Sequence, residues 1–257
     1  MKKIFYLAVV IGLGAFVLVS ATCSQQPAKD PHRSKDQTGK GFAVMELFTS
    51  QGCSSCPPAD EILGNYAKQN DERIIPLAFH VDYWNRLGWV DSLSRSAYTG
   101  RQNEYASKFK LESIYTPQLI INGQHELVGS DEEKIEGLVT NALKETPAAN
   151  IKIQRTNVAG DKLTVEYSLD MTVSNASINT ILIQEKLLTQ VKAGENRGRT
   201  LTNYNVVRDI STTKLSGTTG TATLQLPKGY NPDSYLVVLL IRNNDSHRIV
   251  AAVKSKL

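Results

Sequence analysis

ELFTSQGCSSCPPAD, residues 46–60, is the most informative stretch of this chain. Cys53 and Cys56 are separated by two serines, and two prolines follow directly. Residues 42–48 form a short apolar run, which predicts a buried strand. From Pro58 onward the apolar residues have the spacing of one helix face, at positions 59, 62, 63, 66 and 67. We therefore expect the cysteines where a strand ends and a helix begins, with the prolines in the first helical turn.

The pattern that follows predicts an α/β domain over residues 41–147. Its further elements are expected to be a strand at 77–81, a helical insertion that includes a helix at 94–109, a hairpin of strands 118–121 and 125–128 around Asn122-Gly123, and a helix opened by a capping box at Ser130. Residues 148–257 have a different sequence pattern. Short strand-like runs alternate there with Gly, Asn and Asp clusters, which predicts an all-β, sandwich-like domain.

The N-terminal end is typical of an exported protein. Lys2 and Lys3 precede an uncharged apolar run and then small residues, which predicts a signal peptide over residues 1–22. Cys23 follows directly and resembles the lipidated cysteine of bacterial lipoproteins, although Ser20 and Thr22 depart from the usual residues. The resemblance implies a lipid-anchored protein of the bacterial cell envelope, facing the periplasm or the exterior. Plain secretion and an uncleaved membrane anchor are the alternatives.

The remaining composition describes an ordinary globular protein with a polar tether. Residues 23–40 are polar and carry two prolines, so we expect a flexible link between Cys23 and the folded body. Losing two of the 29 basic residues with the signal peptide leaves 27 against 25 acidic ones, a net charge of +2. Such a small charge gives no support to nucleic-acid binding.

The spacing of Cys53 and Cys56 suits thiol–disulfide chemistry. A cysteine at a helix N-terminus is favoured as the thiolate, and a second cysteine one turn later can resolve a mixed disulfide. This logic makes Cys53 the exposed nucleophile and Cys56 the resolving thiol. A structural disulfide and half of a zinc site remain as alternatives, although a zinc site usually needs a second Cys or His pair and none is present.

At this point the chain resembles the thioredoxin family over residues 42–145. The resemblance depends on Cys53-Ser54-Ser55-Cys56 after a strand and on Thr116-Pro117 before a hairpin. It implies that Pro117 is cis and lies against the cysteines, with the Thr116 backbone helping to dock substrate. It also implies a buried acid that deprotonates the second cysteine, for which Glu46 is the candidate and a salt-bridged structural acid the alternative.

A closer resemblance is to a bacterial secreted, thioredoxin-like family that is catalogued only as a domain of unknown function. It depends on three stretches: residues 46–60, AFHVDYW at 78–84 and GENRGRT at 194–200. The chain departs from thioredoxin itself in having Gly52 before the first cysteine, two serines between the cysteines, and an insertion near residues 82–110. The resemblance therefore implies an architecture but names no substrate.

Two further groups are candidates for substrate binding. His80, Asp82 and Trp84 follow the second strand, and His80 could stabilise a thiolate or move a proton. Arg197 and Arg199 lie in a Gly-rich loop that could fold over the cysteines and bind an anionic group. The alternatives are a hydrogen-bonded structural cluster for the first group and a solvated hairpin tip for the second.

These observations predict an exported thiol–disulfide oxidoreductase that acts on exported proteins, exchanges electrons with a redox partner protein and needs no cofactor. Two rivals stay open. One is a copper or zinc carrier that uses Cys53, Cys56 and His80, because thiolates and imidazole suit soft metals. The other is a scaffold that keeps a thioredoxin-like fold without catalysis.

Overall fold

The computed structural model describes residues 39–257, which all fall in one compact unit. The predicted signal peptide, the predicted lipidation site at Cys23 and all but the last two residues of the predicted tether lie outside the described residues. Among residues 39–257, no helix combines the length and the apolar character needed to cross a membrane.

The described residues form eleven strands, three α-helices and two short 3-10 helices. In chain order they are β1 (Ala43–Thr49), α1 (Pro57–Lys68), β2 (Ile74–His80), η1 (Asn85–Leu87), α2 (Ser96–Phe109), β3 (Gln118–Ile121), β4 (His125–Val128), α3 (Glu132–Ala142), β5 (Ile151–Ala159), β6 (Lys162–Leu169), β7 (Ala176–Gln190), β8 (Thr200–Lys214), β9 (Thr219–Gln225), η2 (Pro232–Ser234), β10 (Tyr235–Asn243) and β11 (Ile249–Lys256).

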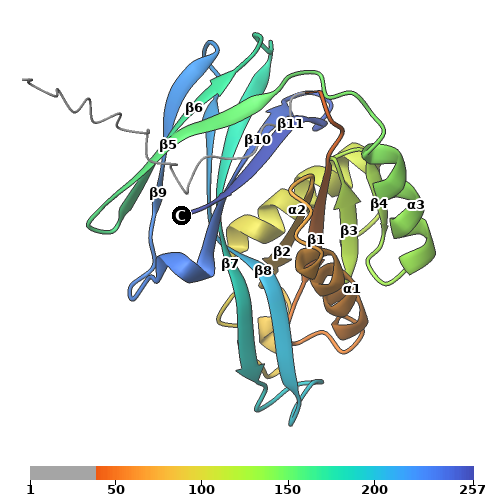
Figure 1. The fold of residues 1–257 in the computed structure, drawn as a ribbon. Helices are drawn as coiled ribbons and strands as arrows, with labels where there is room; N and C mark the ends of the chain where they lie inside the picture. The colour runs from red at the N-terminus through yellow and green to blue at the C-terminus, as the bar shows by residue number, and fades with distance from the viewer. Residues whose placement is uncertain (1–38) are drawn as a thin grey trace, which may run out of the picture. The chain divides into compact units, whose positions relative to one another are not determined.

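The fold is mixed α/β, with a large β-sheet and few helices (Figure 1). Eight strands form one sheet in the order β11-β10-β7-β8-β2-β1-β3-β4, and β5, β6 and β9 form a second sheet. The β1–β2 and β2–β8 pairs are parallel, while the other pairs of the large sheet are antiparallel. Strands from both halves of the chain therefore share one sheet.

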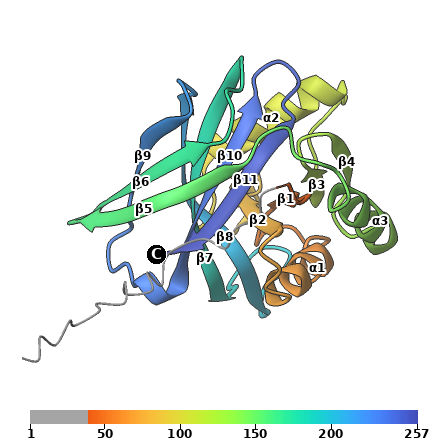
Figure 2. The same ribbon diagram turned by 45° about the horizontal axis from the view of Figure 1, so that its top comes forward.

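Three apolar clusters fill the space against the large sheet. On one face, α1 and α3 cover β1 and β3 through residues such as Met45, Leu63 and Val139. On the same face, the three-stranded sheet packs on β7, β10 and β11 through residues such as Val165 and Leu239. Figure 2 shows β5, β6 and β9 in front of β10 and β11, with α2 behind them.

Helix α2 covers the other face and joins the two halves. Its cluster combines residues of β1 and β2 with residues of β7, β8 and β10. Arg101 of α2 donates from Nε and Nη2 to the two carboxylate oxygens of Glu46 on β1, at 3.0 and 2.7 Å. The Nη1 atom of the same guanidinium donates to Asn179 Oδ1 on β7 at 3.0 Å. One buried cation therefore holds strands from both halves of the chain.

The order of the elements agrees with the sequence-based prediction, but the joining of the two halves does not follow from it. After residue 147, strands of two sheets face each other across an apolar core. One of these sheets, however, continues through β8 into β2 and β1. β7 and β8 are also much longer than the runs predicted at 178–183 and 205–207. Their extra residues are mixed in polarity, so hydrophobic pattern alone does not reveal them.

We predict that Arg101→Met lowers the free energy of unfolding by about 3–5 kcal/mol, because it leaves the Glu46 carboxylate buried without its partner. Urea denaturation of the purified protein measures this. The double variant Glu46→Met/Arg101→Met removes both charges and should recover most of the loss. Arg95→Ala, which breaks the exposed Arg95–Asp209 pair at 3.4 Å, is the control and should cost about 0–1 kcal/mol. Equal effects of Arg101→Met and Arg95→Ala would contradict the role given to α2.

Candidate functional site

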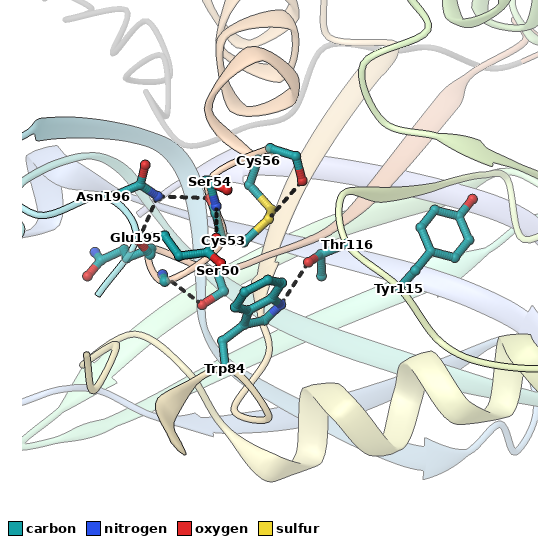
Figure 3. The surroundings of a disulfide bond; sticks show 12 residues. Ser50, Cys53, Ser54, Cys56, Trp84, Tyr115, Thr116, Glu195 and Asn196 are labelled. Atoms are coloured by element: carbon teal, nitrogen blue, oxygen red, sulfur yellow. Dashed lines mark hydrogen bonds between the residues drawn. A yellow bond between two sulfur atoms is a disulfide. The ribbon is translucent and has the colours of Figure 1, made fainter. Parts of the chain in front are cut away.

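A disulfide joins Cys53 and Cys56 at the start of α1, with their Cα atoms 5.4 Å apart (Figure 3). Cys56 is the N-cap residue of the helix, and the two prolines occupy the first helical positions. The backbone turns tightly here: Cys53 N donates to Ser50 O at 3.1 Å, and Cys56 N donates to Cys53 O at 3.3 Å. The predicted location of the pair, between a strand and a helix, is confirmed.

The prediction that Cys53 is exposed is wrong. Cys53 and Cys56 are both 0% exposed, while Ser54 and Ser55 between them face solvent. One cover is Trp84, which packs on the turn so closely that a Cβ at Gly52 would lie 3.3 Å from Trp84 Cβ. A second cover comes from a distant part of the chain, which the sequence pattern did not place at the cysteines.

That second cover is the hairpin loop, residues 191–199, which connects β7 to β8. Asn196 is buried there and its Nδ2 donates to Gln51 O at 3.0 Å and to Cys53 O at 2.8 Å. Glu195 accepts from Ser54 N at 3.0 Å, and hydrogen bonding to the side chain and then the backbone of Ser54 lowers the pKa of the Glu195 carboxyl. Figure 3 shows both residues beside the cysteine turn. The Gly-rich loop thus does reach the cysteines.

The residues of the hairpin loop that touch the cysteine turn are not the two arginines singled out from the sequence. Arg199 acts indirectly, because its Nη1 donates to Asn196 Oδ1 at 2.9 Å. Arg197 is exposed to solvent. Glu195 and Asn196 were missed, although they belong to the 194–200 stretch that carries the family resemblance. The sequence alone gives no reason to single out these two side chains, and only the fold reveals their hydrogen-bond partners.

Gln51 connects the cysteine turn to two other parts of the chain and was also missed. Its amide nitrogen Nε2 donates to Thr189 Oγ1 on β7 at 2.9 Å, and its Oε1 accepts from Trp89 Nε1 at 3.1 Å. Its backbone N donates to Asp91 Oδ2 at 2.9 Å. The residue before Gly52 therefore fixes the turn against the hairpin and against the segment that follows β2.

His80 and Asp91 form a buried pair beneath the turn. His80 Nδ1 lies 2.7 Å from Asp91 Oδ2, and both side chains are 0% exposed. Burial alone would lower the pKa of His80, but the carboxylates of Asp91 and Asp60 raise it above its ordinary value of 6.5. Burial alone would raise the pKa of Asp91, but His80 and the hydrogen bonds to Asp91 lower it. Both directions favour an imidazolium–carboxylate pair.

Asp60 is a further buried acid near the cysteines. It lies in the first turn of α1, four residues after Cys56, and the residue is 7% exposed. Burial raises the pKa of Asp60 from 3.8 to about 7, against a smaller lowering by His80. The stretch 46–60 ends at this residue, yet its burial could not be read from the helical pattern because acids in a first turn are ordinarily solvated.

The other predicted residues divide into two groups. Trp84 Nε1 donates to Thr116 Oγ1 at 2.8 Å beside the disulfide (Figure 3). The Thr116–Pro117 peptide bond is cis. Asp82 instead accepts from Thr99 Oγ1 of α2 at 2.6 Å. Glu46 pairs with Arg101 on the face of the sheet that α2 covers, whereas α1 packs on the opposite face. The structure therefore does not place Glu46 with Cys56.

Among residues 39–257, no group of three or more His, Cys, Asp and Glu side chains is arranged to hold a metal ion. In a carrier that uses the cysteine pair, His80 would be the third ligand. Its Nδ1 is engaged by Asp91, and the two sulfurs are bonded to each other.

Comparison with solved structures gives likenesses over most of the chain, including the following two. The crystal structure of protein AGR_C_4864 from Agrobacterium tumefaciens is 26% identical, with a TM-score of 0.64, and the match covers 87% of this chain and 96% of that one. HBP35 of Porphyromonas gingivalis is 15% identical, with a TM-score of 0.57, and the match covers 86% and 77%. The second likeness concerns the fold alone.

Comparison with the curated proteins gives no match. The family model described as "Protein of unknown function (DUF1223)" matches residues 44–242, and the chain therefore belongs to this family.

Proposed function

We propose that this protein is a thiol–disulfide oxidoreductase that works through Cys53 and Cys56. The observation that carries the proposal is a Cys-x-x-Cys disulfide at the N-terminus of a helix. The free N–H groups and the dipole at this position stabilise a thiolate once the disulfide is reduced. The buried ionisable groups beneath the turn add to this argument, because perturbed titrations cluster at functional sites.

The proposal extends to the fold of residues 41–147, which we infer to be thioredoxin-like. The support is the arrangement of its parts. Strands lie in the order β2-β1-β3-β4, with β1 and β2 parallel and the β3–β4 hairpin antiparallel to β1. Helices α1 and α3 lie on one face of these strands and α2 on the other. Thr116-Pro117 lies between α2 and β3, and Thr116 bonds to Trp84 beside the disulfide.

The chemistry has two steps that balance without a cofactor. In the reduced protein the Cys53 thiolate attacks a disulfide of a protein substrate, forms a mixed disulfide and releases one substrate thiolate. Cys56 then loses its proton and attacks the Cys53 sulfur. The second substrate thiolate leaves, and Cys53 and Cys56 end as the disulfide seen in the structure. The reverse sequence oxidises a substrate dithiol.

The location and partners belong to the same proposal. The sequence pattern of the predicted signal peptide and of Cys23 supports a lipid-anchored protein of the bacterial cell envelope, and we infer that exported proteins are the substrates and that a second redox protein renews the pair. Arg197 and Arg199 lie on the hairpin loop next to the cysteine turn, where they suit an anionic part of a substrate. Trp84 and Thr116 suit contact with substrate backbone.

A second candidate function is a scaffold with an inert disulfide. The specific observation in its favour is that both cysteines are fully buried. A buried disulfide can simply stabilise the turn, and structural disulfides resist reduction by the glutathione pool. The two candidates differ in whether Cys53 ever reacts with another thiol.

We predict that Cys56→Ser traps a mixed disulfide through Cys53, whereas Cys53→Ser forms none. The reason is that only the resolving thiol can release a covalently bound substrate. The measurement is mass analysis of each reduced variant after incubation with a disulfide-bonded protein. A scaffold predicts no adduct with either variant. The double variant Cys53→Ser/Cys56→Ser is the control for labelling elsewhere.

We predict that Asn196→Ala speeds reduction of the Cys53–Cys56 disulfide by dithiothreitol about 30-fold. Asn196 makes two hydrogen bonds to the turn, and the loss of about 1 kcal/mol for each favours opening of the hairpin loop. Alkylation of free thiols in samples taken at successive times measures the rate of disulfide reduction. Lys192→Ala, an exposed position of the same loop, is the control and should react like the wild type. An unchanged rate for Asn196→Ala would exclude the hairpin loop as the cover that limits access.

A further inference from the structure

The edge of β8 that faces α1 carries backbone groups that no other strand uses. Along its opposite edge, β8 pairs with β7 from one end to the other. On the α1 side its partner is β2, and the two strands pair only between Val206 and Ala78. Within residues 39–257, the part of β8 at residues 200–205 therefore has one edge without a partner strand.

The hydrogen bonds of the β7–β8 hairpin show which backbone groups lie on this edge. Val191 N donates to Arg199 O at 2.9 Å, and the strands stay in register beyond this pair. In an antiparallel ladder every second residue directs both its N–H and its C=O to the partner strand. Leu201 therefore faces β7, whereas Thr200 and Thr202 direct these groups to the opposite edge. Among residues 39–257, no turn, loop or cap hydrogen bond engages the backbone of either threonine.

This edge lies in a groove between β8 and α1. Figure 1 and Figure 2 both show α1 beside this part of β8. Thr200 and Thr202 line the groove from β8, Pro57 and Glu61 line it from α1, and its volume is about 290 Å³. Thr200 is exposed and Thr202 is half-buried, so solvent reaches the groove. Its volume is near the lower end for ligand sites, which suits a short stretch of one chain rather than a folded domain.

The two walls of the groove are held together at Tyr204. A Cβ at Gly64 would lie 2.4 Å from Tyr204 Cδ2, so only a glycine lets α1 approach β8 as closely as it does here. Lys68 Nζ lies 4.9 Å from the centre of the same ring. Packing within the chain therefore sets the distance between the walls.

The groove leads to the disulfide along both of its walls. On the α1 side, Pro57 follows Cys56 directly. On the β8 side, Arg199 lines the groove and donates to Asn196 Oδ1 at 2.9 Å, and Asn196 in turn donates to Cys53 O at 2.8 Å. A chain that lies in the groove is therefore next to the cysteine turn and to the hairpin loop that covers it.

The chemistry of the groove matches an extended polypeptide. N–H and C=O groups that recur at every second residue are the partners of another strand, and the addition of a strand to a free sheet edge is a recurring mode of peptide recognition. Arg199 adds a charged contact at the cysteine end. Its guanidinium forms no ion pair within the part of the chain that the structure describes, so it suits an acidic side chain of the bound segment.

We propose that the substrate docks as an extended strand along β8, pairing with Thr200 and Thr202 in the α1–β8 groove while its own cysteine reaches Cys53. This inference rests on the proposed function and names the form in which the substrate is bound: an unfolded or loop segment of a protein. The docking strand belongs to the second half of the chain, outside residues 41–147. The resemblance to thioredoxin therefore implies nothing about this edge.

The test uses the full chain with Cys23→Ser and Cys56→Ser, in which Cys53 is the only thiol. The probe is a peptide of about ten residues with one central cysteine, supplied as its symmetric disulfide. The Cys53 thiolate forms a mixed disulfide with one peptide and releases the other as a thiolate. We expect the Thr200 and Thr202 amides to exchange hydrogen at least about fivefold more slowly in this adduct, the factor that corresponds to about 1 kcal/mol per hydrogen bond. The Leu201 amide, which already faces β7, should change little.

Competition with glutathione for Cys53 measures what the groove adds to binding. Thr202→Pro removes an N–H that faces the groove and leaves the β7 side intact, since proline is tolerated on a free strand edge. We expect the preference of Cys53 for the peptide over glutathione to fall at least about fivefold. Thr223→Pro is the matched control and should leave the preference unchanged. By the same alternation, counted from the bond of Leu226 N to Asp161 O, Thr223 lies on β9 with its N–H directed away from β6.

Two N-methylated peptides test backbone pairing without any change to β8. One is methylated at alternate nitrogens and the other at the remaining ones, and only one of these sets faces Thr200 and Thr202. We expect one peptide to lose its preference over glutathione and the other to keep it. If no peptide forms an adduct with Cys53, the proposed function is overturned and this inference with it. If adducts form but both threonine amides stay unprotected, or both methylated peptides behave alike, only the docking site is overturned.

Discussion

Pro76 interrupts the hydrogen-bonding edge of β2, and the way β8 meets that edge organises the molecule. Proline has no N–H to offer a neighbouring strand, and β2 and β8 pair at Ala78 and Val206 alone. Asn205, with φ of 46°, donates from Nδ2 to Pro76 O at 3.0 Å beside this point. Other contacts replace the backbone hydrogen bonds that a regular pair of strands would form here. Asn205 binds β2, Arg101 reaches both β1 and β7, and α2 closes the apolar face. The result is one continuous sheet, and it brings a hairpin from the second half of the chain to the cysteines in the first.

This shared sheet explains why the disulfide is buried. The hairpin loop reaches the cysteine turn because β7 and β8 run on past the strands that pair with them. Its bonds to the turn come from Asn196 and Glu195, and each uses a backbone group that a bare turn would offer to water. The N-terminus of a helix stabilises a thiolate electrostatically, but in this structure the hairpin loop covers the cysteines. Beside this cover, His80 and Asp91 form a buried ion pair at the edge of the sheet that holds the cysteine turn.

Much of the local structure could be predicted from the sequence, while the long-range contacts could not. The helix after Cys56, the hairpin around Asn122-Gly123 and the helix after residue 130 follow from periodicity and turn chemistry, and all are present. His80 was identified because it ends a strand near the cysteines. Glu46 was given the part of the buried acid because it interrupts an apolar strand, but strand alternation directs it to the α2 face and to Arg101. Asp60, Gln51 and Asn196 were missed because what matters about them is their burial, which depends on how β8 packs against α1 and on where the hairpin loop ends.

The redox equilibrium of Cys53 and Cys56 in the purified full chain decides between a working dithiol and an inert cross-link. The protein would be equilibrated in glutathione buffers of graded potential, its thiols trapped by alkylation, and the reduced fraction read by mass. The account predicts a reversible midpoint between about −120 and −270 mV, the range of known exchange catalysts. A pair that stays oxidised below about −300 mV would contradict it, because that behaviour is typical of structural disulfides.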